Sequence, residues 1–166
     1  MTTGRPAGGA DRGAVSPALA VVFATVGYLA LVIFGLGMLS LALDESVIEE
    51  PGLGPLPGVA ATTLSIVAFG ATLWGPVRRT QPSFWNSAWV MVASFLAYLA
   101  GLWIMAVATG TAVGIATAVA GRIATTGFGL VIAAAALVAA WSGIALVRTR
   151  ARRPRWPWES DDEETL

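Results

Sequence analysis

The chain of 166 residues contains no cysteine and no histidine. These two absences exclude disulfides, thiol nucleophiles, imidazole general bases and the usual zinc and haem ligands from within the chain. Any cofactor would have to be supplied by a partner. We therefore expect no catalytic residue, no metal site and no bound cofactor here, and we predict that the protein is not an enzyme.

Charged residues are also scarce. They make up 12% of the chain, whereas hydrophobic residues make up 56%, and a soluble domain has about 25% charged residues. The composition therefore predicts an integral membrane protein. All ten basic residues are arginine, which, with the abundant alanine and glycine, indicates a GC-rich coding bias rather than a function.

The segment Ala18 to Leu43 determines how the rest of the chain is interpreted. It holds 26 residues without a charge, and a helix of that length would reach about 39 Å, enough to cross a bilayer core with some tilt. A secretory signal is the alternative, with Ser40-Leu41-Ala42 as a cleavage site. Signal cores are about 7 to 15 residues long, so we favour an uncleaved first span.

Three further apolar segments follow, at about residues 58–77, 87–109 and 123–147. With the first segment at 18–43 they predict an all-α, four-span helix bundle over residues 18–147. Residues 1–17 are rich in glycine and proline and are predicted to be a disordered cytoplasmic tail. The mildly apolar connector at 110–121 is either a short interfacial helix or an extension of a neighbouring span.

The arginines predict the orientation of the chain. Arg78 and Arg79 lie between the second and third segments, and five more arginines follow the fourth, whereas the first connection carries only acidic residues. By the positive-inside rule, we expect a multi-pass protein of the cell membrane with both termini in the cytoplasm. Arg122 does not fit this orientation, because it would lie on the outer side of the membrane. We interpret it as a side chain that reaches the headgroups or pairs with the acidic first connection.

The first connection puts four carboxylates within seven residues: Asp44, Glu45, Glu49 and Glu50. A calcium ion needs six to eight oxygens, and paired carboxylates could also act as acid and base. The segment lacks the alternating spacing and central glycine of a calcium loop, so we expect these residues only to keep it outside the membrane and hydrated.

The motif Val47-Ile48-Glu49-Glu50-Pro51 with Gly54-Pro55-Leu56, between a first and a second span, resembles small uncharacterised four-span membrane proteins of high-GC Gram-positive bacteria. The resemblance covers about a tenth of the chain. It implies no activity, cofactor or site residue.

Polar side chains inside the spans are hydroxyls, from Thr25 and Tyr28 in the first span to Ser142 in the last. We expect these hydroxyls to bond to their own backbone or to a neighbouring helix. A proton-coupled transporter would need a buried acid or histidine, and small multidrug exporters, which also have four spans, need a glutamate in the first span. The predicted spans contain none of these residues. The leading prediction is a non-catalytic accessory, assembly or envelope-associated protein. The alternative is a small-solute or ion pathway lined by hydroxyls and backbone carbonyls.

Small residues recur at about four-residue spacing on two spans and form a candidate packing seam. The seam consists of Ala93, Ala97, Gly101, Gly127, Ala135, Ala139 and Gly143. Such stripes let helix backbones approach closely in lipid. We favour packing within one copy, and association with a membrane protein partner or a second copy stays open.

The C-terminal tail, residues 148–166, is basic and then acidic. Its candidate lipid-headgroup contacts are Arg148, Arg150, Arg152, Arg153, Arg155, Trp156 and Trp158. Basic residues at a membrane exit attract anionic lipid, and tryptophan favours the interface. A simple stop-transfer anchor is the alternative. We expect no nucleic-acid binding, because the acidic half of the tail would repel phosphate.

Overall fold

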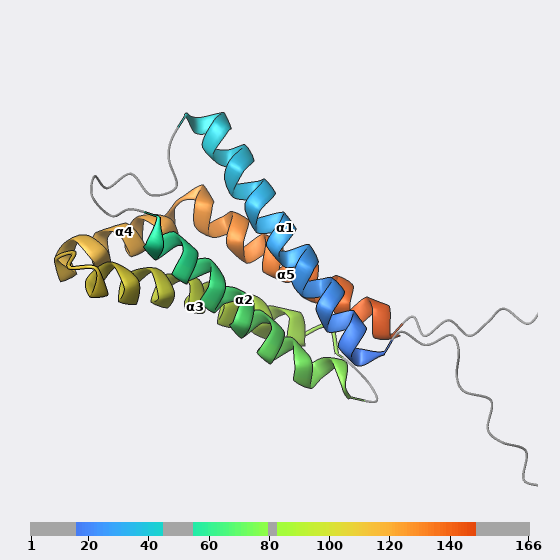
Figure 1. Ribbon diagram of the computed structural model, residues 1–166. Coiled ribbons are helices and arrows are strands. Elements are labelled where there is room, and N and C mark those ends of the chain that lie inside the picture. The colour runs from blue at the N-terminus through green and yellow to red at the C-terminus, as the bar shows by residue number, and fades with distance from the viewer. Residues whose placement is uncertain (1–15, 45–54, 80–82, 149–166) are drawn as a thin grey trace, which may run out of the picture.

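The computed structural model describes residues 16–44, 55–79 and 83–148, and these ranges are all-helical, with no strand. The five helices are α1 (Pro17–Leu43), α2 (Leu56–Val77), α3 (Asn86–Ala108), α4 (Val113–Thr125) and α5 (Gly127–Arg148). Figure 1 shows their arrangement. Four of them, α1, α2, α3 and α5, are long and apolar enough to cross a membrane. The predicted all-α fold with four spans is confirmed.

The first three spans begin and end within two residues of the predicted bounds. The last long helix begins at Gly127 rather than at about residue 123, where the fourth span was predicted to start, because residues 123–125 belong to α4 and the helix is interrupted at Thr126. The connector at 110–121, for which the sequence allowed either a short helix or an extension of a span, lies mostly within α4. It is a separate helix of 13 residues, too short to cross a bilayer.

Local sequence explains where α1 begins and α3 ends. The Ser16 hydroxyl accepts a hydrogen bond from the Leu19 amide at 3.2 Å, and Pro17 takes the first helical position, where its missing N–H costs nothing. At the other site, Gly110 has φ +92°, and the Gly110 and Thr111 amides donate to Val107 and Ala106. This is a Schellman motif, in which glycine ends the helix by adopting a left-handed backbone.

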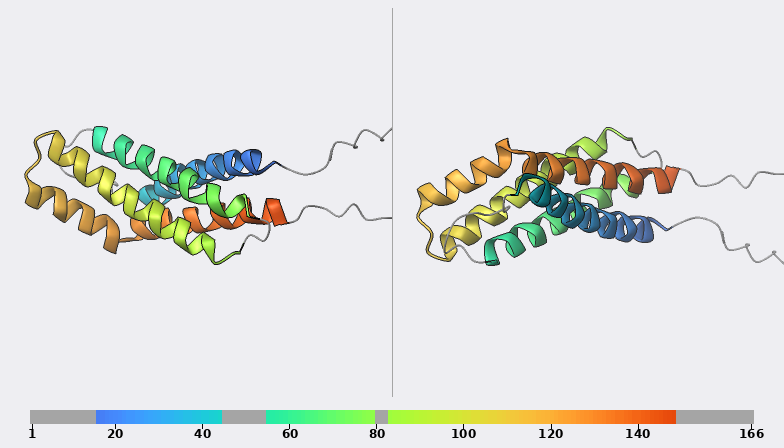
Figure 2. Two further views of the ribbon diagram at one scale, coloured as in Figure 1. Left: turned by 90° about the horizontal axis from the view of Figure 1, so that it is seen from below. Right: turned by 90° about the horizontal axis from the view of Figure 1, so that it is seen from above.

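Helix α5 is the central element of the bundle. It packs against α1 and α3 most extensively and also contacts α2 and α4, while α2 and α3 form a closely packed antiparallel pair. Figure 2 shows α4 lying at one end of the bundle, with the start of α1 and the end of α5 at the opposite end. That opposite end also holds the end of α2 and the start of α3 (Figure 1).

Large side chains fill the interior between the helices. The largest of those with less than 2% of their surface exposed are Tyr28, Phe69, Phe128, Leu73, Leu102, Ile123, Ile132 and Ile144. They belong to two clusters, one joining α1, α2, α3 and α5 and the other joining α2, α3, α4 and α5. The described bundle is therefore packed with side chains through its centre.

The second half of α1 departs from this packing. Its last buried residue is Val32, and beyond it Ile33, Phe34 and Leu41 are exposed, Leu41 by 81%. Leu36 and Leu39 alone pack partly against the core clusters from this half of α1. Figure 1 shows this end of α1 diverging from its neighbours.

Candidate functional site

A chain of hydrogen bonds links three helices in the interior. The Ser65 hydroxyl on α2 donates to the Ser94 carbonyl on α3 at 2.8 Å. The Tyr28 hydroxyl on α1 lies 2.6 Å from the same Ser65 oxygen. Because a serine hydroxyl has one hydrogen, Tyr28 is the donor in this second bond. The Tyr28 ring also stacks on Phe69 with 4.6 Å between ring centroids, so both ends of the tyrosine are held.

Most other hydroxyls in the helices bond within their own helix, as expected. They donate to the carbonyl four residues earlier, as Thr63 does to Val59 at 2.8 Å and Ser142 to Val138 at 2.8 Å. Thr117 on α4 also donates to the Val113 carbonyl at 2.8 Å, and its oxygen accepts a second bond from the Trp103 ring nitrogen on α3 at 3.0 Å. This contact ties α4 to the end of α3.

Two glycines of the predicted seam lie where helices approach closely. A Cβ atom added to Gly101 would lie 2.9 Å from the Ala61 Cα on α2, a backbone atom that cannot move aside cheaply. A Cβ atom on Gly143 would lie 2.9 Å from the Ala24 Cβ on α1. Both glycines are buried. Gly101 therefore lets α3 pack against α2, and Gly143 lets α5 pack against α1.

The other seam residues are placed less uniformly. Ala135 and Ala139 are buried on α5, whereas Ala93 and Ala97 are half-buried beside the fully buried face of α3. Gly127 is exposed, and a Cβ there would lie 3.1 Å from Leu39 of α1. The predicted seam is thus two separate surfaces, one on α3 and one on α5, that contact different helices. Its role stays a prediction.

An elbow joins α4 to α5. Thr126 has an extended backbone, with φ −100° and ψ 173°, and its carbonyl accepts the Gly129 amide at 3.1 Å. A Cβ atom on Gly129 would overlap the Ile123 carbonyl oxygen. Glycine at 129 is therefore needed for the turn, and this is the physical reason why the predicted fourth span does not begin at 123.

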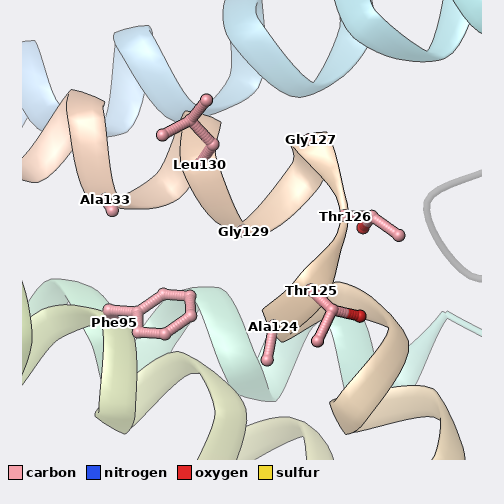
Figure 3. A pocket seen from close by; sticks show the side chains of 8 residues that line it. All are labelled: Phe95, Ala124, Thr125, Thr126, Gly127, Gly129, Leu130 and Ala133. Atoms are coloured by element: carbon pink, nitrogen blue, oxygen red, sulfur yellow. The ribbon is translucent and has the colours of Figure 1, made fainter.

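A hollow of about 420 Å³ lies between the elbow and α3. Figure 3 shows Phe95 on one side of it and the elbow residues on the other. Its lining consists of Phe95, Ala124, Thr125, Thr126, Gly127, Gly129, Leu130 and Ala133. The Thr125 hydroxyl donates to the Gly121 carbonyl, while the Thr126 hydroxyl is the buried side-chain group that lacks a hydrogen-bond partner within the described ranges. The hollow has no ionisable side chain in its lining.

A second hollow of about 420 Å³, the α2–α3 groove, lies on the outer side of these two helices. It is lined by Leu56, Val59, Ala60, Thr63, Leu64, Val67, Gly101, Ile104 and Met105. The only hydroxyl in this lining is that of Thr63, which bonds to its own helix. The groove is suited to an apolar occupant.

Arginine and aromatic side chains meet at the end of the bundle that holds the start of α1. The Arg148 guanidinium lies 4.5 Å from the Phe84 ring centroid, and Phe84 stacks on Trp141 with 5.8 Å between centroids. One helix away, the Arg78 guanidinium lies 5.4 Å from the Trp74 ring centroid. We call Arg78, Arg148, Trp74, Phe84 and Trp141 the arginine–aromatic end.

Several predicted site residues lie outside the described ranges. These are Arg150, Arg152, Arg153, Arg155, Trp156 and Trp158 of the tail, and Glu45, Glu49 and Glu50 of the first connection. Asp44 is described and exposed. Over 16–44, 55–79 and 83–148, no group of three acidic, cysteine or histidine side chains is placed to hold a metal ion.

Comparison with known families adds a classification. A family model matches residues 14–165, nearly the whole chain. The chain belongs to DUF6121, a family of unknown function. No curated protein and no solved structure matches it. The family supports the expectation of an uncharacterised membrane protein, whereas the expected origin in high-GC Gram-positive bacteria stays a prediction.

Sequence reasoning did not single out the Tyr28–Ser65–Ser94 connection or the elbow. The three residues carry hydroxyls on different spans, and spacing along the chain does not reveal which helix faces meet. The elbow did leave a signal in Thr126-Gly127-Phe128-Gly129, since threonine is a good N-cap and glycine weakens a continuous helix.

Proposed function

We propose that this protein is a non-catalytic accessory or assembly component of a larger complex in the cell membrane, with both termini in the cytoplasm. The observation that carries the proposal is the contrast between a filled interior and an apolar exterior. Tyr28, Phe69 and Phe128 occupy the centre with about 1% or less of their surface exposed. Such a protein would bind other proteins through its outer surface.

A small-solute or ion pathway is the second candidate. It would have to be lined by hydroxyls and carbonyls, and the interior hydroxyls of Tyr28, Ser65 and Ser94 are already bonded to one another or to backbone. A pathway between the helices would require these groups and the large side chains around them to separate. Flux of labelled solutes into proteoliposomes tests this alternative directly.

The α2–α3 groove is the docking surface that we propose for the partner, and its occupant is a membrane-spanning helix of another protein. Because α2 and α3 approach closely at Gly101, the groove has a shallow floor that includes Ala60. The exposed apolar residues Val59 and Ile104 border this floor. Small residues at a floor allow a helix backbone to approach, which is how helices associate in lipid. Since the Thr63 hydroxyl is satisfied by Val59, the occupant needs no polar group.

The arginine distribution supports the proposed orientation. Arg78, Arg79 and Arg148 lie at the end of the bundle where α1 begins and α5 ends, and Asp44 lies at the other end of α1. Arginines close to span ends favour the cytoplasmic side. The same orientation was predicted from sequence, and it remains part of the proposal.

Site-specific photo-crosslinking in native membranes tests the docking proposal. A crosslinker at Ile104, which is 56% exposed, is compared with one at Phe23, which is 62% exposed on α1 and remote from the groove. We expect a discrete protein adduct from Ile104 and none from Phe23. Ala60→Phe, which fills the groove, should abolish the adduct while the thermal stability of the isolated protein is retained. Lipid adducts alone at both positions would overturn the proposal.

A further inference from the structure

The arginine–aromatic end contains two independent pairs of the same kind. In one, Phe84 precedes α3 and lies between Arg148 and Trp141 of α5. In the other, Arg78 follows α2 and contacts Trp74 one helical turn earlier. Stacking on an aromatic ring fixes a guanidinium in place without using its N–H donors. Both arginines are therefore positioned with donors available for an anion.

The charges around this end have one sign. The described ranges contain five charged side chains: Asp44, Arg78, Arg79, Arg122 and Arg148. Three of the arginines belong to the ends of α2 and α5 that lie together, and the carboxylate of Asp44 follows the far end of α1 (Figure 1). No described carboxylate is therefore close enough to neutralise these three arginines.

The aromatic residues around this end indicate headgroup depth. Trp85 and Trp89, at the start of α3, are 77% and 67% exposed, and Trp74 and Trp141 are also exposed. Tryptophan rings concentrate at the boundary between the acyl chains and the headgroups. An arginine stacked on a ring at that depth is at the level of lipid phosphates.

We propose that the arginine–aromatic end binds anionic phospholipid headgroups of the adjacent leaflet. Arg78, Arg79 and Arg148 supply the charge and the planar donors that match a phosphate oxygen pair. Phe84 and Trp74 are positioning residues that hold two of the guanidinium groups at the right depth. This binding is separate from the proposed docking of a partner helix in the α2–α3 groove.

The test uses the purified full-length protein in mild detergent, titrated with phosphatidylglycerol or with phosphatidylcholine, with bound lipid counted by native mass spectrometry. We expect tighter binding of phosphatidylglycerol and a loss of this preference as salt rises. Arg148→Gln and Arg78→Gln should each weaken phosphatidylglycerol binding about fivefold, the effect of one arginine near a charged surface. Thr109→Ala, at the opposite end of α3, is the control: it removes a hydroxyl that bonds within its own helix and should leave the preference unchanged.

Phe84→Leu tests the positioning role, because it keeps every charge. We expect it to lower the preference for phosphatidylglycerol over phosphatidylcholine, a ratio that a merely structural defect would not change. Equal binding of the two lipids by the unaltered protein would overturn the proposal. So would Arg148→Gln and Arg78→Gln proteins that bind like the unaltered one, because the arginines at 150–155 would then account for all the attraction.

Discussion

The hydroxyl oxygens of Tyr28 and Ser65 lie 2.6 Å apart in the interior, where α1 crosses α2. Ser65 passes its own hydrogen to the Ser94 carbonyl on α3, so one serine connects three spans. In a lipid environment no water competes for these groups. The connection therefore fixes which faces of the three helices meet, a choice that apolar packing alone leaves less sharply defined.

Ser65→Ala is expected to destabilise the bundle. It leaves the Tyr28 hydroxyl without an acceptor and the Ser94 carbonyl without its donor from α2, at a cost of about 1 kcal/mol in unfolding free energy. Titration with a denaturing detergent measures the loss. Ser142→Ala is the control, because that hydroxyl is exposed and bonds within its own helix. Equal stabilities of the two variants would contradict a structural role for the connection.

Gly101→Ala tests the close approach of α3 to α2. The added methyl would lie 2.9 Å from the Ala61 Cα, and overpacking of this kind typically costs about 1 to 3 kcal/mol. Gly27→Ala, where nothing lies within 4 Å of the added atom, should instead be neutral or stabilising, since alanine favours a helix by about 1 kcal/mol over glycine. Thermal unfolding in detergent compares the two. A stable Gly101→Ala protein would show that α3 can move away from α2.

Ala97→Leu addresses the half-buried part of the predicted seam. If this side chain packs within the bundle, the larger residue lowers the thermal stability of the isolated protein, and this is the result that we expect. Unchanged stability with loss of a co-purifying protein would instead assign the position to an interface. A variant that matches the unaltered protein in both respects would place Ala97 against lipid.

Thr126→Val tests whether the unpartnered hydroxyl at the elbow contributes to stability. A buried polar group without a partner costs about 1 to 3 kcal/mol, so replacing it with a methyl group should leave stability unchanged or raise it. Thr126→Ser, which keeps the hydroxyl, is the comparison. A clear loss of stability or of folding in the valine variant alone would mean that the hydroxyl has a ligand or a bound water in the native membrane.

Topology reporters check the orientation. A reporter that is active only outside the cytoplasm should be active after insertion near Glu49 or Thr111 and silent near Thr80 or at the C-terminus. The arginines at the ends of α2 and α5 are the physical reason. Activity at the C-terminus would contradict the proposed four-span arrangement with both termini in the cytoplasm.

Sequence predicted the spans well because hydropathy directly reflects the cost of placing a side chain in lipid. The predicted second span at about 58–77 corresponds to α2, which runs from Leu56 to Val77. The elbow was missed because apolar residues such as Ile123 and Phe128 lie on both sides of it, although the extended backbone of Thr126 separates the two helices. The Tyr28–Ser65 contact was missed because it depends on the rotation of two helices about their axes, which residues 37 positions apart do not encode locally.

The central position of α5 has a consequence for how the protein is made. Chains are synthesised from the N-terminus, so α1 to α4 leave the ribosome before the helix that contacts all of them. The contact between Ala24 of α1 and Gly143 of α5 can form only after α5 has been synthesised, whereas the α2–α3 pair can form earlier. Assembly therefore ends with insertion of the last 22-residue helix between α1 and α3, and a nascent chain halted before Gly127 holds three spans that are joined through α2 but lack the helix that packs most extensively against α1.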